Sequence, residues 1–289
     1  MKIKTLKNGF SLPVIGIGTW PMGGYRKHDK NNDDERDIKA LRFAIDNGVT
    51  HIDTAELYAR GYSEIILGKA IEGYDRKNLI IASKASLDSL LTKEGIKNAC
   101  RESLKRVNTN YFDLYYLHWR NKEVPLKIQM EALEELYEEG LIKNIGVSNF
   151  KTETLREAQS YCKYPIVANQ VHYNLIFRGP ERDGLLKYCQ DNDIMLVAYR
   201  AVELGKLANT GNSVMLDFAD KYVGYTHAEL AISWLISQKN VVALFGGSKL
   251  DFITENIKAA ELVMDNEDIE HGRNDYDGQI EVSDSIPLA

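Results

Sequence analysis

Short apolar runs recur along the chain, each followed by a polar loop and then by a longer segment with helical spacing. The longer segments place apolar residues three and four positions apart, as in DIKALRFAIDNG and ERDGLLKYCQDN. This alternation predicts eight strands, each followed by a helix. The eight apolar runs are 14–18, 50–53, 78–84, 112–118, 145–149, 166–171, 194–199 and 241–247.

The predicted strands are apolar enough to be buried on both faces, which is typical of a parallel sheet covered by helices. Eight strand–helix units favour closure into an α/β (β/α)8 TIM barrel, with an open doubly wound sheet as the alternative. Asn8-Gly9, between two alternating runs, predicts a short N-terminal β-hairpin. Glycines at 48, 73 and 140 stand where helices are expected to end.

Length and charge extend this picture. The 289 residues suffice for one barrel of about 250 residues. No linker rich in Pro, Gly or Ser divides them, so we expect a single domain over 1–289. Residues 262–289 hold eight acidic side chains and one arginine, so this tail carries −7 and the other residues carry +1, for a net charge of −6. This composition predicts a solvated, partly mobile acidic C-terminal extension.

Composition also bears on partners and compartment. The chain has no overall basic field, so we expect no nucleic-acid partner. Three cysteines, odd in number and far apart, argue against a disulfide framework or zinc site and favour a reducing cytosol. No stretch has the length of a membrane span or the apolar segment of a signal peptide. We therefore expect a soluble, cytoplasmic protein without a metal.

Four polar residues close or follow neighbouring predicted strands: Asp53, Tyr58, Lys84 and His118. In a barrel the carboxyl ends of the strands and the following loops build the active site, so these side chains are expected to converge. Tyrosine, with a pKa of about 10, is a weak acid unless a nearby ammonium stabilises its anion, and a carboxylate can hold that ammonium. The set suits proton transfer to a carbonyl oxygen as hydride reaches its carbon.

Each of the four residues also has a plainer interpretation. Asp53 could cap a helix, Tyr58 could pack on the rim, and His118 could be satisfied at the core edge. Lys84 could cap a strand or form a Schiff base in a lyase. The joint occurrence at successive strand ends favours the catalytic interpretation, and a lysine held as a cation is a poor amine nucleophile.

Seven motifs in this order and spacing resemble the aldo-keto reductase superfamily, over about residues 5 to 260. The resemblance implies an NAD(P)H-dependent oxidoreductase that reduces aldehydes or ketones, sugars included, to alcohols. It implies that Tyr58 is the general acid, that Lys84, held by Asp53, lowers the pKa of Tyr58, and that His118 orients the carbonyl. The motifs are GIGTW (16–20), HIDTAELY (51–58), ASK (82–84), DLYYLHW (113–119), GLIKNIGVSNF (140–150), NQVHYN (169–174) and GGSKLDFITENI (246–257).

The resemblance further implies which residues contact the cofactor. Ser148, Asn149 and Gln170 would hydrogen-bond the nicotinamide carboxamide, which needs both donors and acceptors. Tyr199 would stack under the nicotinamide ring. Further contacts would line the pocket or reach the phosphates and adenine: Thr19, Trp20, Gly247, Ser248, Lys249, Glu255 and Asn256. Asp53, Tyr58, Lys84 and His118 form the tetrad of this site. Trp20 and Trp119 stand beside the loops that carry it and would form an apolar substrate pocket.

Three positions depart from the family pattern. Phe252 stands where many NADP-dependent members carry arginine, so NADP(H) is favoured as cofactor with NAD(H) as the alternative. Arg200 replaces the usual serine, and we expect it to contact the cofactor pyrophosphate or, alternatively, a tail carboxylate. His172 replaces a common glutamate, and we interpret it as structural. Trp234, in a helical pattern, is expected in the core.

A second function from another class is a nicotinamide-binding, redox-sensing regulatory subunit with little turnover, because some relatives of this fold serve as channel subunits. The substrate depends on the loops near 22–33, after His118 and at 200–211. Because the acidic tail is a poor apolar wall, we expect small aldehydes, ketones or sugars rather than steroid-sized substrates. The resemblance favours a monomer.

Overall fold

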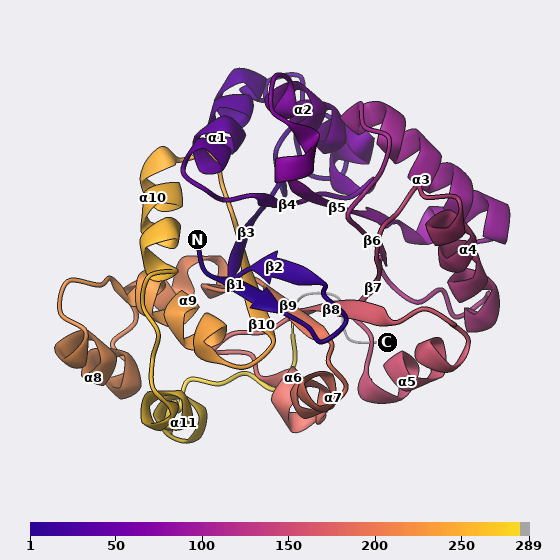
Figure 1. The fold of residues 1–289 in the computed structure, drawn as a ribbon. Helices are drawn as coiled ribbons and strands as arrows, with labels where there is room; N and C mark the ends of the chain where they lie inside the picture. The colour runs from indigo at the N-terminus through magenta and orange to yellow at the C-terminus, as the bar shows by residue number, and fades with distance from the viewer. Residues whose placement is uncertain (284–289) are drawn as a thin grey trace.

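Eight parallel strands close into a barrel surrounded by helices, in a computed structural model that describes residues 1–283 (Figure 1). The strand order is β10-β3-β4-β5-β6-β7-β8-β9, so each strand pairs with its neighbour in sequence and β10 returns to β3. The predicted (β/α)8 barrel is confirmed, and the open sheet is wrong. The strands are β3 (Ile15–Gly18), β4 (His51–Asp53), β5 (Ile80–Ala85), β6 (Leu114–Leu117), β7 (Ile145–Ser148), β8 (Ile166–His172), β9 (Met195–Tyr199) and β10 (Val241–Gly246).

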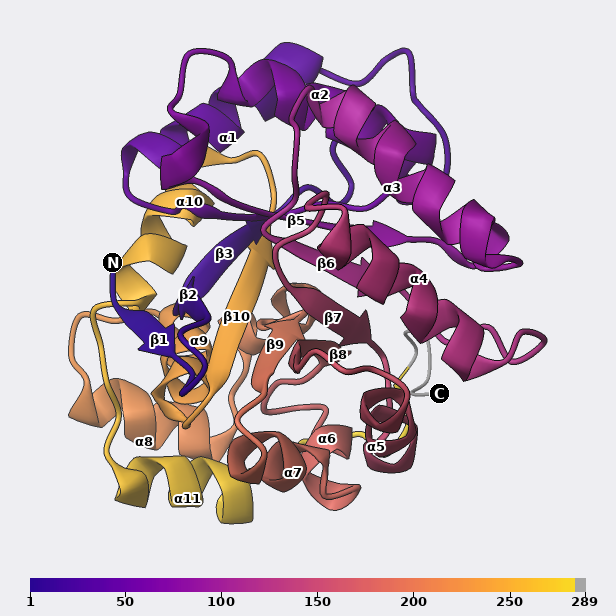
Figure 2. The same ribbon diagram turned by 45° about the vertical axis from the view of Figure 1, so that its right-hand side comes forward.

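The helices follow the strands in the predicted alternation and form the outer layer in both views (Figure 2). The segment 181–192, predicted as one helix, divides into α6 and α7 because Gly184 between them takes a left-handed φ of 70°. The helices are α1 (Asp34–Asp46), α2 (Tyr62–Ile71), α3 (Lys93–Val107), α4 (Leu126–Glu138), α5 (Thr152–Ser160), α6 (Gly179–Arg182), α7 (Leu185–Asp191), α8 (Ser213–Lys221), α9 (His227–Ser237), α10 (Leu250–Ala259) and α11 (Asn266–Asp275).

An antiparallel hairpin of β1 (Ile3–Thr5) and β2 (Ser11–Pro13) lies across one end of the barrel, as predicted (Figure 1). Its turn uses Gly9 at φ 90°. Leu6, Phe10 and Leu12 of the hairpin are buried in one cluster with inward-facing barrel residues such as Tyr116. The hairpin therefore closes the amino-terminal end, which leaves the carboxyl end for a site.

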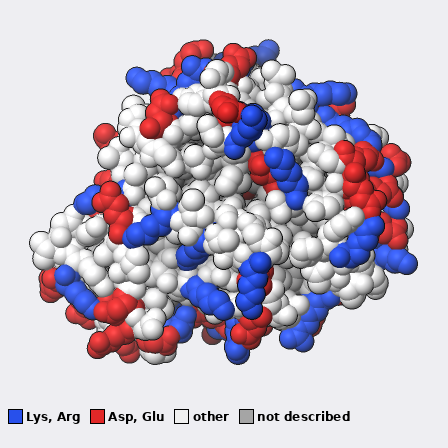
Figure 3. All heavy atoms as spheres, in the orientation of Figure 1, with Lys and Arg blue, Asp and Glu red and all other residues white. Residues whose placement is uncertain are grey.

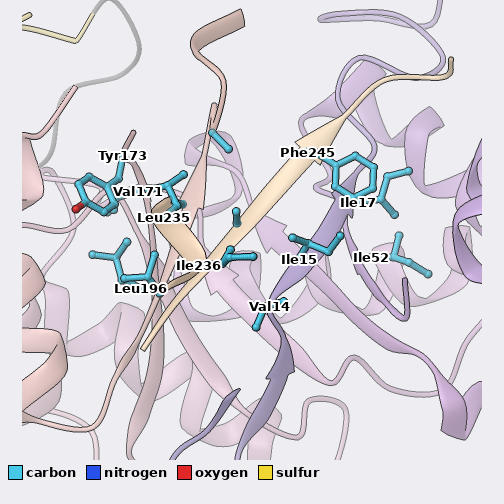
Figure 4. Packing of buried hydrophobic residues seen from close by; sticks show 14 of the residues in the cluster. Val14, Ile15, Ile17, Ile52, Val171, Tyr173, Leu196, Leu235, Ile236 and Phe245 are labelled. Carbon is cyan, nitrogen blue, oxygen red and sulfur yellow. The ribbon is translucent and has the colours of Figure 1, made fainter. Parts of the chain in front are cut away.

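Side chains alternate between the two surfaces of the barrel wall. Outward residues such as Ile17, Leu196 and Phe245 pack in the cluster that also holds Leu235 and Ile236 of α9 (Figure 4). Inward residues such as Ala82 and Leu114 form a second, smaller cluster. On β5 the next inward position after Ala82 is Lys84, so the barrel interior changes from apolar to charged toward the carboxyl end.

The acidic tail is partly packed against the rest of the chain. Residues 266–275 form α11, and the indole N–H of Trp234 donates a 3.1 Å hydrogen bond to the carbonyl of Ile269. Farther on, Ile280 bridges Phe177. Ile269 and Tyr276 give the segment a buried apolar side, while residues such as Val282 are exposed, so the charge count alone misses the packed part of the tail. Residues 284–289 of the tail, Asp284 among them, lie outside the described residues.

Acidic and basic side chains are interspersed over the face shown in Figure 3. Acidic groups gather over α11 and over α3–α4, and at α3–α4 Lys93 and Lys97 pair with Glu135. In the described part of the chain, no helix is both long and apolar enough to cross a membrane.

Candidate active site

Lys84 is fully buried near the end of β5, on the strand that pairs with β4 and its Asp53. Its ammonium forms an ion pair with Oδ1 of Asp53 and donates a 2.9 Å hydrogen bond to the carbonyl of Thr54. Burial acts to lower the pKa of Lys84, but Asp53 and Tyr58 outweigh it, and the pKa is raised. The side chain is therefore a charged ammonium, which makes it a poor Schiff-base nucleophile.

Tyr58 lies in the loop after β4, with its hydroxyl 3.3 Å from Nζ of Lys84. The next two residues, Ala59 and Arg60, have left-handed φ values of 49° and 54°, a conformation that costs about 1–3 kcal/mol for a residue other than glycine. The turn is held by a 2.9 Å hydrogen bond from the N–H of Ala59 to the carbonyl of Tyr25. Tertiary contacts therefore fix the backbone that carries the Tyr58 hydroxyl.

The pKa of Tyr58 is raised because burial outweighs the opposing effect of the Lys84 ammonium. Lys84 acts in the expected direction, since both its charge and its hydrogen bond lower the pKa. The effect of Lys84 has the direction that the resemblance implies, and the partial removal of the hydroxyl from water opposes it. Tyr58 thus keeps its proton at neutral pH.

His118 follows β6, and its ring meets the Tyr58 ring edge-on with centroids 5.8 Å apart. It stacks on Trp119 at 3.7 Å, and its Nδ1 is buried without a hydrogen-bond partner. Burial, together with the charge of Lys84, holds the pKa of His118 well below its usual value, so the imidazole is neutral. The structure therefore brings all four predicted residues, Asp53, Tyr58, Lys84 and His118, to one place.

An aromatic wall stands beside the Tyr58 hydroxyl. The ring of Trp20 lies 5.3 Å from that of Tyr58 and 5.3 Å from that of Tyr25, and Trp20 is 40% exposed. Trp119 is buried behind His118. Tyr25 was missed as a single residue by sequence reasoning, although its loop, 22–33, was expected to shape the substrate site.

The three residues expected to meet the nicotinamide carboxamide are buried and lie together. Ser148 Oγ donates to the carbonyl of Gln170 (2.9 Å), and Asn149 Nδ2 donates to Ser148 Oγ (3.1 Å). The Tyr199 hydroxyl donates to Oδ1 of Asn149 at 2.9 Å. Gln170 contacts the tetrad itself, because its Nε2 donates a 2.7 Å hydrogen bond to Oδ2 of Asp53.

A second buried polar cluster lies behind Tyr199. His172 stacks parallel to Tyr199 and holds Oε2 of Glu203 through Nε2 at 2.6 Å, while its Nδ1 meets the Ser283 hydroxyl at 2.6 Å. Arg200 lies 3.5 Å from Oε1 of the same Glu203. Glu203 stands three residues along the same loop, and the expected contact of Arg200 with the cofactor pyrophosphate or a tail carboxylate stays a prediction. The ring nitrogens of His172 contact Ser283 and Glu203, and its interpretation as structural stays a prediction.

Thr19 borders the tetrad, because its N–H donates a 2.9 Å hydrogen bond to the carbonyl of Asp53, whereas the segment after β10 contacts α1. Thr19 is buried and donates to the Thr54 hydroxyl at 2.8 Å. The Ser248 hydroxyl donates to the buried carboxylate of Asp37 on α1, across 211 residues of sequence. Sequence reasoning missed Asp37 and Glu203, because no motif signals contacts that distant packing creates.

The residues of this segment fit a dinucleotide phosphate. Gly247 has φ 119°, and a Cβ there would meet nothing within 4 Å. The first turn of α10 has no side-chain cap on its N–H groups, which leaves donors of the kind that bind phosphate. The Lys249 ammonium lies 5.1 Å over the half-exposed ring of Phe252, while Glu255 and Asn256 lie partly buried one turn later.

No group of His, Cys, Asp and Glu within residues 1–283 is arranged to hold a metal ion. Cys100, Cys162 and Cys189 are buried free thiols whose pKa values burial raises. The charged side chains that the site offers are therefore those of the tetrad and of the loops after β9 and β10.

Comparison with known proteins agrees with this geometry. The sequence model of the Aldo/keto reductase family matches residues 14–273. Methylglyoxal reductase YeaE of Escherichia coli (strain K12) is 34% identical over 258 residues, which cover 88% of this chain and 87% of that protein.

Solved structures show the same likeness. A thermostable aldo-keto reductase, Tm1743, in complex with the inhibitor epalrestat, is 38% identical with a TM-score of 0.90, over 94% of this chain and 98% of that one. An aldo-keto reductase from Klebsiella pneumoniae in complex with NADPH is 32% identical with a TM-score of 0.83, over 100% of this chain and 99% of that one. The resemblance seen in the sequence motifs is confirmed, and the chain belongs to the aldo/keto reductase family.

Proposed function

We propose that this protein reduces small aldehydes or ketones to alcohols with NADP(H). The observation that carries the proposal is the Tyr58 hydroxyl, 3.3 Å from a buried, charged Lys84 and beside a neutral His118. A carbonyl oxygen placed there meets the tyrosine O–H and the one N–H of a neutral imidazole. The Trp20 ring supplies an apolar wall for the rest of the substrate.

When bound, the reduced nicotinamide supplies hydride to the carbonyl carbon. Tyr58 donates its proton to the oxygen as negative charge develops there. An alkoxide is about as basic as hydroxide, whose conjugate acid has a pKa of about 15.7, so even a tyrosine with a raised pKa can protonate it. Lys84 stabilises the tyrosinate that remains, Asp53 holds Lys84, and His118 orients the carbonyl without taking the proton.

Two groups of residues at the carboxyl end of the barrel support the cofactor assignment. Ser148, Asn149 and Gln170 provide buried donors and acceptors for the carboxamide, and Tyr199 provides a ring beside them. The open backbone at Gly247 and the start of α10 suit the phosphates. The NADPH complex of the Klebsiella pneumoniae protein supports NADP(H) over NAD(H). The remaining cofactor contacts in this proposal are Thr19, Trp20, Arg200, Ser248, Lys249, Glu255 and Asn256.

The experiment that tests this function is a cofactor-oxidation screen with methylglyoxal, other short aldehydes, ketones and aldoses, with NADPH and NADH in parallel. Methylglyoxal is included because the Escherichia coli relative is a methylglyoxal reductase. We expect turnover with at least one substrate. In Tyr58→Phe it falls by about 10²–10⁴-fold, the usual contribution of general acid catalysis.

The matched control for that variant is Tyr164→Phe, because Tyr164 lies before β8 and its hydroxyl donates to the surface side chain of Glu138. It should keep wild-type turnover. Quenching of tryptophan fluorescence by NADPH should persist in Tyr58→Phe. Full turnover in Tyr58→Phe, or NADPH binding with no turnover on any substrate, would refute the proposed reaction.

We further propose a monomeric, single-domain protein of the cytoplasm that binds no nucleic acid. The docking of α11 on α8 and α9 supports one domain for the described residues. Three unpaired, buried cysteines suit a reducing compartment. The net charge of −6 and the mixed surface in Figure 3 offer no basic field to a nucleic acid.

A further inference from the structure

Gln170 makes a contact that its expected role as a carboxamide ligand does not require. Its Nε2 donates a 2.7 Å hydrogen bond to Oδ2 of Asp53. Asp53 binds Lys84 through its other oxygen, Oδ1, and Lys84 donates to the Tyr58 hydroxyl. Four side chains from β8, β4, β5 and the loop after β4 thus form one chain of hydrogen bonds that ends at the candidate acid.

Burial makes this contact consequential. Gln170, Asp53 and Lys84 are 3%, 1% and 0% exposed, so water does not replace a lost partner. A carboxylate oxygen only accepts hydrogen bonds, so the amide of Gln170 must turn its N–H₂ toward Asp53. The carbonyl Oε1 is then left as the free acceptor of the amide.

We propose that Gln170 is a positioning residue of the proton relay: it fixes Asp53, and through Asp53 and Lys84 it fixes the hydroxyl of Tyr58. This proposal rests on the proposed function, and it gives Gln170 two partners: the acid Tyr58, through Asp53 and Lys84, and the nicotinamide. The N–H₂ end holds the relay, and the Oε1 end accepts from the carboxamide. A cofactor that binds at Oε1 is therefore linked, through Gln170, Asp53 and Lys84, to the hydroxyl of Tyr58.

The charged and titratable groups around Tyr58 define the expected effect. They are Lys84 from β5, Asp53 from β4 and His118 after β6, with Tyr116 of β6 under the Lys84 ammonium. Loss of the Gln170 donor leaves Oδ2 of Asp53 unpartnered, so the carboxylate draws the ammonium more strongly. The ammonium then stabilises tyrosinate less, and Tyr58 becomes harder to ionise.

The test is the titration of Tyr58 in the cofactor-free protein, followed by NMR of ¹³Cζ-labelled tyrosine, with Tyr58→Phe to identify its signal. In Gln170→Met we expect the midpoint of the Tyr58 titration to rise by about one pH unit, because the charge-assisted hydrogen bond to Asp53 is lost. The matched control is Gln159→Met. Gln159 lies ahead of β8, at the end of the barrel opposite Tyr58, and its side chain makes three hydrogen bonds. The control should leave the Tyr58 midpoint unchanged.

A second variant keeps the proposal falsifiable if Gln170→Met does not fold. In Gln170→Glu, an added carboxylate faces Asp53, and the Tyr58 midpoint should also rise. An unchanged midpoint with weakened NADPH binding would overturn the proposal, because Gln170 would then be a carboxamide ligand only. The titration needs no turnover, so its failure is distinct from a failure of the proposed reduction, which the substrate screen detects.

Discussion

Asp53 and Lys84 form an ion pair in which both side chains are almost completely removed from water, at 2% and 0% exposure. Taking two charges out of water is costly, and the cost is balanced only when both are present and hydrogen-bonded. The Lys84 ammonium meets this condition with Asp53, Thr54 and Tyr58 as acceptors. The Asp53–Lys84 ion pair therefore affects both the stability of the carboxyl end of the barrel and the acidity of Tyr58.

We predict that Lys84→Met destabilises the fold by about 3–5 kcal/mol, because it leaves the Asp53 carboxylate buried without a counter-ion. The double variant Lys84→Met with Asp53→Asn should recover much of the loss, since it removes the uncompensated charge. Urea unfolding of the three proteins measures the difference. Lys105→Met, which breaks an exposed pair with Glu102, is the control and should leave the free energy of unfolding nearly unchanged. A double variant no more stable than Lys84→Met would contradict this account.

Acid should destabilise the protein through His51. Its ring is fully buried with both nitrogens unpartnered, and burial, aided by Lys84, lowers the pKa of His51 to about 4. The unfolded chain binds this proton near pH 6.5, so the contribution to stability is complete above pH 6.5 and is lost as pH falls toward 4. The loss over this window should be about 3 kcal/mol. Urea unfolding at pH 7, 5.5 and 4.5 should show a shallower acid decline for His51→Leu than for the wild type.

His271 provides a control, because its contribution to stability changes with pH in the opposite direction to that of His51. Hydrogen bonds that its ring donates to Asp275 and Asp217 raise the pKa of His271, so its contribution is present below pH 6.5 and is lost as pH rises through the folded-state value. His271→Ala removes a contribution that grows as pH falls, so its acid decline should be at least as steep as that of the wild type. Equal acid profiles for His51→Leu and the wild type would show that His51 does not carry the effect.

The barrel and the four central residues could be predicted because their signals are local. Each strand is a short apolar run, and Lys84 and His118 stand at the polar ends of such runs. The barrel geometry then dictates that these ends meet at one mouth. The spacing of apolar residues and turn residues such as Gly9 depend only on neighbouring positions, so both can be recognised in a single sequence.

The remaining features depend on pairs far apart in the chain. Ser248 meets Asp37 across 211 residues, and Gln170 meets Asp53 across 117 residues. The upward shift in the pKa of Tyr58 likewise results from how completely other segments cover it. A sequence shows which groups exist, but the balance between burial and charge is decided by packing.

The packing of the acidic tail rests on a close approach at Gly272. A Cβ at this position would lie 2.4 Å from the indole nitrogen of Trp234. Gly272→Ala should therefore push α11 away from α9 and destabilise the protein by about 1–3 kcal/mol, as overpacking does. Thermal unfolding and limited proteolysis of the tail measure the effect. Gly211→Ala, where a Cβ would meet nothing within 4 Å, is the matched control, and equal effects of both substitutions would rule out the contact as the cause.

Lys249 is expected to decide how strongly the protein distinguishes NADPH from NADH. The Lys249 ammonium lies over the ring of Phe252 at the start of α10, and the family resemblance implies a cofactor contact at this turn. A 2′-phosphate near this turn would form a charge-assisted hydrogen bond of about 1.5–3 kcal/mol with the ammonium. Lys249→Met should therefore raise the KM for NADPH about tenfold or more and leave the KM for NADH nearly unchanged, in steady-state assays with one aldehyde. Lys239→Met, a surface lysine that donates to the carbonyl of Gln190, should alter neither value. If Lys249→Met weakened both cofactors equally, the ammonium would act on a part of the dinucleotide that the two share, and the preference would have to come from another residue.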